Sequence, residues 1–395
     1  MNAVIRQPSK VVSINPAILR WAREWRGRTV EDAADKVKKL PSDILAWEAG
    51  RSTPTYAQAR VLAQFYERAF LEFFLDEPPL LAPLELVPDF RLHRGQTNPA
   101  DDRELQLIQA WAEAARLDAL DLCAQLGVEV PTIPQTLRFN TNADVESAAF
   151  EVRQSLKFTI QDQLAMTKAD ARTLPNILRE RYEDFGILTL RRPDLKKLRA
   201  RGICIAQTPL PVIVVQNEAS TAQAFTLAHE LGHILLGESG IIGERKPTRQ
   251  PIERWCDRFA AAFLMPIDVV TALVGPRPPE PVPTISNETL ERVADTLRVS
   301  PHALLVRLVH LRYVEEEFYW NVKKPQFDAL ESEATRFGRS SYYGARYRAQ
   351  MGDFYTGLVL EAWATGRISN HNAAEYMGIK RIDHLDAIRR EFTAQ

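Results

Sequence analysis

The feature that most constrains the fold is the segment STAQAFTLAHELGHILLG, which begins at Ser220 and sets two histidines and a glutamate among apolar residues. The apolar residues recur at helical spacing around nearly the whole segment, which predicts a deeply buried helix. Residues four apart on a helix share one face, so His229 and His233 lie one turn apart on the same side. Buried imidazoles need partners, because an unsatisfied polar group in a core costs free energy. The segment therefore predicts a packed core built around a polar site.

The order His229, Glu230, His233 is the HExxH arrangement, in which two imidazoles on one helical face hold one metal ion. Glu230 stands next to the first histidine, so its carboxylate can deprotonate a water molecule at the metal without being a ligand. We therefore predict a metal site with Glu230 as the catalytic base. The alternative is a buried helix that carries two histidines by coincidence.

The next predicted helix, PIERWCDRFAAAFLMP at 251–266, supplies candidates for the third ligand that a catalytic zinc needs. Glu253 is the predicted ligand, although the helix dipole alone also favours an acid in a first turn. Asp257 lies four residues later on the same edge and is predicted to hydrogen-bond a histidine ligand. Cys256 is either a rival ligand or a small core residue, and thiolate ligands usually come in clusters. Zn2+ suits this ligand set, and Mn2+ would also be accepted.

The segments FTLAHELGHILLG and IERWCDRFAAAFLMP, preceded by the hydrophobic strand PVIVVQN, resemble the ImmA/IrrE family of metallopeptidases over residues 143–315. The resemblance implies a helical, zincin-like domain with a small sheet. It implies a metal bound by His229, His233 and Glu253, with Glu230 as general base. It also implies cleavage of a repressor that shares or neighbours the same regulatory circuit.

The amino-terminal part predicts four compact helices, and its WARE, WEAG and STPTYAQARVLAQFY segments resemble the XRE class of helix-turn-helix regulators over residues 13–75. The resemblance implies a third helix that enters the major groove of DNA. The side chains best placed for phosphates or base edges are Lys36, Lys38, Lys39, Ser42, Arg51 and Thr53. Asp43 and Glu48 make that helix acidic, so dimerisation or the binding of a protein partner is the alternative role.

The predicted fold is mainly α-helical with a small β-sheet, whose strands are the β-branched segments GILTLRR, GICIAQ and PVIVVQN. Residues 240–251 are predicted to form a loop. His302 and His310, in a helix pair that follows, are interpreted as ordinary core or surface histidines. Four parts are predicted: a helix-turn-helix domain at 1–76, a linker and connector helix at 77–140, a metallopeptidase domain at 141–318, and a helical C-terminal domain at 319–395.

Composition excludes several classes of partner and compartment. Fifty basic and fifty-one acidic side chains give a net charge of −1, so DNA binding must come from a local patch. No apolar stretch approaches the ~20 residues of a membrane span, and residues 1–12 lack the pattern of a secretory signal. Three cysteines in apolar contexts are too few for a disulfide framework. We therefore expect a cytoplasmic protein with no membrane association.

These observations favour a transcriptional regulator with a zinc-dependent endopeptidase domain that hydrolyses peptide bonds in a regulatory protein. The alternative is a non-proteolytic, DNA-binding antitoxin with a PIN-type ribonuclease toxin as partner, because fusions of these two modules resemble known antitoxins. In that case the metal site would be structural or vestigial, but the intact Glu230 favours catalysis, since a structural site needs no general base. The expected partners are a DNA operator, a repressor substrate or cognate toxin, and a second copy of the chain.

Overall fold

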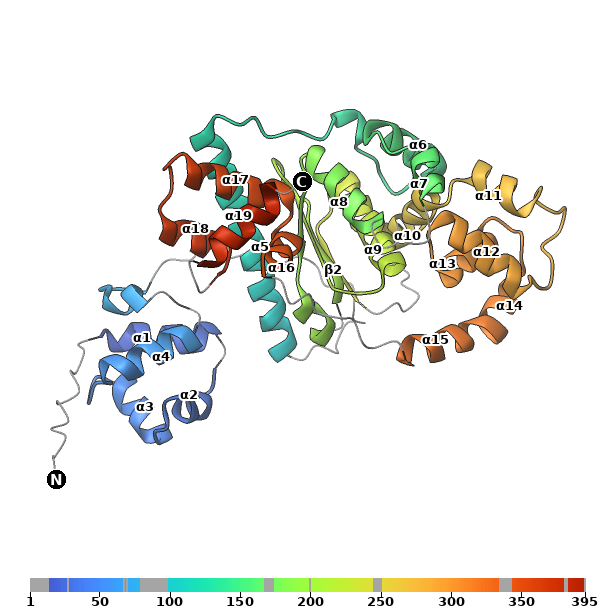
Figure 1. Cartoon of the computed structure of the whole chain (residues 1–395). Coiled ribbons are helices and arrows are strands. Elements are labelled where there is room, and N and C mark those ends of the chain that lie inside the picture. The colour runs from blue at the N-terminus through green and yellow to red at the C-terminus, as the bar shows by residue number, and fades with distance from the viewer. Residues whose placement is uncertain are drawn as a thin grey trace, which may run out of the picture. The chain divides into compact units, whose positions relative to one another are not determined.

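A computed structural model of the chain describes residues 14–26, 28–66, 68, 70–78, 99–166, 174–198, 200–243, 251–333, 343–379 and 383–393. The described residues are mainly helical with one small sheet, which confirms the predicted fold class (Figure 1). The chain divides into two compact units. The first comprises Met1–Glu85 and Asn98–Gln106, and the second comprises Leu86–Thr97 and Leu107–Gln395. Among the described residues, no helix combines the length and apolar composition that crossing a membrane requires.

The first unit contains the four amino-terminal helices that the sequence predicts. They are α1 (Pro16–Arg26), α2 (Val30–Val37), α3 (Pro41–Glu48) and α4 (Tyr56–Phe65), followed by the short 3₁₀ helix η1 (Phe70–Phe74). The Thr29 side chain caps α2 by accepting from the backbone N–H of Asp32, as its sequence position suggests. Arg23 of α1 donates to both carboxylate oxygens of Glu48 of α3 at 2.6 and 2.9 Å, which ties the two helices together.

The sheet of the second unit has the strand order β1-β3-β2-β4. Its strands are β1 (Leu188–Arg191), β2 (Ala200–Ile205), β3 (Val212–Val215) and β4 (Gly240–Gly243). Strand β1 runs parallel to β3, whereas β2 runs antiparallel to both β3 and β4. Strands β1, β2 and β3 correspond to the three strands that the sequence predicts. The expectation of a loop at 240–251 was wrong for residues 240–243, because pairing with β2 makes them a strand, and for Pro251, which begins the next helix. Residues 244–250 lie outside the described residues.

Helices α8 (Leu174–Asp184) and α9 (Ser220–Leu236) lie beside this sheet, and α10 (Pro251–Leu264) packs on α9 (Figure 1). The remaining elements are α5 (Pro99–Leu126), η2 (Gln135–Leu137), α6 (Val145–Ser155), α7 (Ile160–Ala165), η4 (Pro193–Leu198), α11 (Ile267–Val274), α12 (Asn287–Leu297), α13 (Pro301–His310), α14 (Glu316–Phe318), the π-helix η5 (Tyr319–Lys323), α15 (Lys324–Glu333), α16 (Tyr343–Met351), α17 (Asp353–Ala364), α18 (Asn370–Tyr376) and α19 (Asp383–Thr393).

Two glycines explain how α9 ends and how closely it packs. Gly237 has a φ of 74° and returns its backbone N–H toward the carbonyl groups of His233 and Ile234, which closes the helix. At Gly232, a Cβ atom would lie 3.1–3.2 Å from the Sγ, Cα and Cβ atoms of Cys256. The absence of a side chain at Gly232 therefore lets α9 and α10 cross at short range.

The C-terminal helices belong to the same compact unit as the sheet, and a buried polar network joins them to it. The Glu183 carboxylate accepts hydrogen bonds from the backbone N–H groups of Asp353 and Phe354, at 2.9 and 2.8 Å, in the first turn of α17. Arg179, also on α8, donates to the backbone carbonyl groups of Thr189 and Ala349 at 2.8 and 2.9 Å. These bonds satisfy backbone groups at the junction of α8, β1 and the C-terminal helices.

Candidate metal centre

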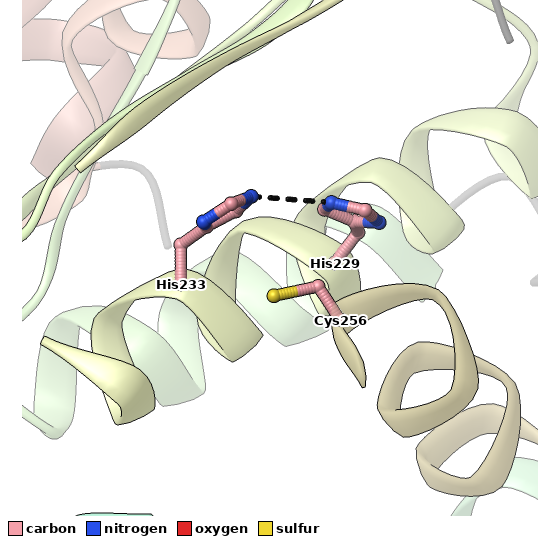
Figure 2. A group of neighbouring side chains, drawn as sticks. All are labelled: His229, His233 and Cys256. Carbon is pink, nitrogen blue, oxygen red and sulfur yellow. Dashed lines mark hydrogen bonds between the residues drawn. The ribbon is translucent and has the colours of Figure 1, made fainter. Parts of the chain in front are cut away.

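The two histidines of α9 face each other inside the second unit. Both are buried, and their Nε2 atoms lie 3.3 Å apart (Figure 2). Nitrogen ligands at 2.0–2.1 Å from a tetrahedral zinc lie about 3.4 Å from one another. The observed separation of His229 and His233 therefore fits two imidazoles that share one metal ion.

Glu253 reaches the same point from the first turn of α10. Its Oε1 atom lies 3.1 Å from Nε2 of His233, and its Oε2 atom lies 3.3 Å from Nε2 of His229. Glu253 is 4% exposed and both histidines are buried, so the three side chains meet in a buried site. Two imidazoles and one carboxylate at these distances fit a divalent cation with nitrogen and oxygen ligands.

Asp257 contacts the opposite edge of the His229 ring. Its Oδ1 atom lies 2.9 Å from Nδ1 of His229, while 45% of its side chain is exposed. A carboxylate on Nδ1 holds the proton there and leaves Nε2 free to face Glu253. The structure thus brings Asp257 to the position expected of a residue that orients a ligand.

Cys256 is the other candidate that the structure places here. Its Sγ atom and one ring nitrogen each of His229 and His233 all lie within 4.8 Å of one another (Figure 2). Burial raises the pKa of the Cys256 thiol well above its usual range. Because the Glu253 oxygens lie 3.1–3.3 Å from both Nε2 atoms and Cys256 packs at the Gly232 crossing, the geometry favours Glu253 as third ligand.

The Glu230 carboxylate is fully buried, and within the described part of the chain neither of its oxygens has a hydrogen-bond partner. Burial raises the pKa of Glu230 well above its usual range. A buried acceptor without partners costs free energy, which is expected where a ligand or water completes the site. This unpartnered carboxylate beside the histidines is a second observation that fits a metal with a water molecule nearby.

Gly202 of β2 is a residue of this site that the sequence analysis missed. A Cβ atom at this position would lie only 2.0 Å from Oε1 of Glu230, so the carboxylate occupies the space of an absent side chain. The pairing of β2 with β4 also shifts register between Ala200 and Gly202. A lone glycine inside a strand is a known sign of a bulge or of close approach, and this signal was present in the sequence.

Glu253 and the two histidines of the centre affect one another's pKa values. Burial disfavours its ionised form, yet hydrogen bonds to His229 and His233 hold the pKa of Glu253 at about 2. Burial also opposes protonation of His229, but hydrogen bonds to Asp257 and Glu253 outweigh it and raise the pKa of His229 to about 10. Burial lowers the pKa of His233. A metal cation would therefore take the place of a proton between Glu253 and the histidines.

Comparison with known families identifies the region that carries these residues. Residues 182–309 match the family model Peptidase_M78, the IrrE N-terminal-like domain. We refer to residues 182–309 as the IrrE-like domain. It includes His229, Glu230, His233, Glu253 and Asp257, and also Gly202. The match supports a metallopeptidase type of activity. No curated protein and no solved structure matches the chain.

The six predicted DNA-contacting side chains lie around α2 and α3 of the first unit, and all are exposed: Lys36, Lys38, Lys39, Ser42, Arg51 and Thr53. The Lys36 ammonium lies 5.5 Å from the centre of the Phe65 ring, so this side chain turns toward α4. The exposed surface next to them also carries Leu40 and Leu45, with 67% and 48% of their area accessible. DNA binding by this unit stays a prediction.

Proposed function

We propose that this chain is a cytoplasmic transcriptional regulator whose IrrE-like domain is a zinc-dependent endopeptidase, with a regulatory protein such as a repressor as its substrate. One observation carries the enzymatic part of the proposal. His229, His233 and Glu253 converge within 3.1–3.3 Å, beside a buried Glu230 carboxylate that has no hydrogen-bond partner among the described residues. A general base that is spared from ligation is typical of hydrolytic rather than structural metal sites.

A divalent metal held by His229, His233 and Glu253 would polarise the peptide carbonyl and make a water molecule more acidic. Proton transfer and the orientation of a ligand are carried out by residues of the chain. Glu230 accepts the proton from that water and passes it to the departing amine, a role that suits a buried carboxyl whose pKa is raised. Asp257 fixes the orientation of the His229 ring.

The metal content of matched variants tests this proposal. Purified wild type and Glu230→Gln should each hold about one zinc per chain, because Glu230 is not a ligand. Glu253→Ala should lose most of the metal. The control is Glu238→Gln, because Glu238 is an exposed carboxylate just after α9 and should have no effect. Elemental analysis at equal protein concentration measures the metal.

Peptide digestion followed by mass spectrometry measures activity on the same samples. Wild type and Glu238→Gln should cleave, and Glu230→Gln should be inactive although it holds metal. Full metal retention by Glu253→Ala would refute the ligand assignment. Cleavage by metal-loaded Glu230→Gln at the wild-type rate would refute the assigned base.

For the amino-terminal unit we propose contact with a DNA operator through its exposed basic side chains. If Lys39 contacts a phosphate, Lys39→Ala should weaken binding evenly across sequences and reduce the salt dependence of log K by about one unit of slope. Fluorescence anisotropy on duplexes selected from a random pool measures this. Lys196→Ala, an exposed lysine of the other unit, is the control. Failure of the protein to enrich any duplex would contradict operator binding.

The exposed apolar pair Leu40 and Leu45 favours a second candidate, in which this unit binds a protein. A non-proteolytic antitoxin with a ribonuclease toxin as partner fits that surface. This candidate requires no turnover, so a wild type that holds metal but cleaves no peptide would favour it. Hydrogen exchange with the toxin present should then protect the α3 region.

A further inference from the structure

Helix α10 presents two different ligand atoms to the histidine pair of the centre. Glu253 offers a carboxylate oxygen, and Cys256, three positions later and so on the same face of the helix, offers a thiol. The Cys256 sulfur and one ring nitrogen each of His229 and His233 all lie within 4.8 Å of one another. Figure 2 shows the sulfur beside α9, between the points at which the two histidines leave that helix. The centre therefore contains a second set of potential ligands, two nitrogens and one sulfur.

Gly232 lets the sulfur approach the histidines. A Cβ atom at Gly232 would lie 3.1 Å from the Cys256 sulfur, so a larger residue there would press against the thiol. Because Gly232 directly precedes His233, the sulfur lies against the turn of α9 that carries the pair. A trigonal ion that is about 2.0 Å from nitrogen and about 2.3 Å from sulfur holds these atoms about 3.8 Å apart. The set therefore closes around an ion when the sulfur moves by at most about 1 Å.

The two ligand sets suit different classes of cation. Imidazole together with carboxylate oxygen accepts Zn2+ and Mn2+, whereas thiolate sulfur selects soft cations such as Cu+. Two histidines and one cysteine in a trigonal arrangement are also the ligand set of blue-copper sites. The Cys256 and His233 side chains are both fully buried, so the surrounding protein limits the access of water to an ion held there. The sulfur-containing set therefore favours copper.

We propose that His229, His233 and Cys256 form a copper site, which binds Cu+ in place of the Zn2+ expected at the histidines and Glu253. As the S–Cu bond forms, the thiol releases its proton to the solvent. Both ions need the same two imidazoles, so binding of one excludes the other. Cu+ consequently inhibits zinc-dependent hydrolysis. This inhibition rests on the proposed function, whereas copper binding itself does not.

The test loads the full chain with Cu+ in the absence of oxygen and measures copper affinity by competition with a chromogenic Cu+ chelator. Wild type should bind about one Cu+ per chain and release its zinc. Cys256→Ala should keep its zinc and bind Cu+ at least about 100-fold more weakly, because even a change outside the ligands costs about 10–100-fold in metal affinity. Glu253→Ala should behave in the opposite way, with zinc lost and Cu+ affinity retained.

Cys123→Ala is the control, because Cys123 is a buried cysteine of α5 outside the IrrE-like domain, and its Cu+ affinity should match wild type. X-ray absorption of copper-bound wild type should show one sulfur and two imidazole nitrogens around the ion. Equal Cu+ affinity of wild type and Cys256→Ala, absence of sulfur next to the ion, or loss of zinc from Cys256→Ala would overturn the copper site. A wild type that binds copper in this way but holds no zinc and cleaves no peptide would refute the proposed function and leave the copper site in place.

Discussion

At the residue scale, the candidate centre depends on one contact that crosses from helix to strand. The Glu230 carboxylate fills the space above Gly202 of β2, so any side chain at position 202 must displace it. The clashing atom is the end of a side chain rather than backbone. A small substitution should therefore move the base and leave the fold in place.

We accordingly expect Gly202→Ala to keep the metal and lose activity. A displacement of about 1 Å at a catalytic group can cost about 100-fold in rate, so kcat should fall by that order while KM changes little. Elemental analysis, thermal unfolding and peptide cleavage on the same sample separate these effects. An unchanged kcat would show that the position of Glu230 is not critical.

Some residues of the centre could be predicted from the sequence and one could not, because their relative positions are set by different levels of structure. His229, Glu230 and His233 share one helix, so their relation follows from local helical geometry. Glu253 required the assumption that α10 packs on α9, which the apolar patterns of both helices favoured. Gly202 lies in a strand whose approach to Glu230 depends on tertiary packing, and nothing within its own segment fixes that distance.

At the element scale, the crossing of α9 and α10 at Gly232 and Cys256 brings the third ligand to the histidines. Elements that depend on such contacts were also the ones predicted least well. Four helices were predicted for the amino-terminal part, but after α4 ends at Phe65 the chain also forms the short 3₁₀ helix η1 at Phe70–Phe74. Strand β4, in a predicted loop, exists only through its pairing with β2. Local patterns identify helices well, but tertiary contacts decide where they end.

If Cys256 serves packing rather than ligation, Cys256→Ala should retain the metal. The buried sulfur contributes contacts, so its loss should lower the free energy of unfolding by about 1 kcal/mol. Elemental analysis and urea denaturation check both expectations. Loss of zinc from Cys256→Ala, together with its retention in Glu253→Ala, would exchange the roles of the two residues.

At the scale of the whole second unit, Asp118 of α5 meets Tyr355 of α17 at 3.4 Å. Burial raises the pKa of Asp118 to about 6, and the hydrogen bond from Tyr355 offsets this only in part. The unfolded chain has the ordinary value of about 3.9. At pH values between about 4 and about 6, the folded state binds more protons at Asp118 than the unfolded state does. The contribution of Asp118 to the free energy of unfolding therefore falls as the pH rises through this range.

Asp118→Asn should remove that contribution. The free energy of unfolding of the variant, taken relative to that of wild type at the same pH, should therefore be higher at pH 7 than at pH 4. Urea midpoints of wild type and variant at several pH values measure the difference. The control is Asp268→Asn, because Asp268 is an exposed carboxyl in the first turn of α11. A pH dependence identical to that of wild type would contradict the raised pKa of Asp118.

The contact between Glu183 and the start of α17 has a consequence for how the second unit opens. Glu183 lies at the beginning of the IrrE-like domain, and it holds backbone groups about 170 positions later in the chain. Releasing α17 would break the two hydrogen bonds from the backbone N–H groups of Asp353 and Phe354 and would leave the buried Glu183 carboxylate with only its bond from Thr189, so local fraying there costs free energy. The C-terminal helices and the sheet should consequently exchange their amide hydrogens as one cooperative block, at the slow rate set by global unfolding.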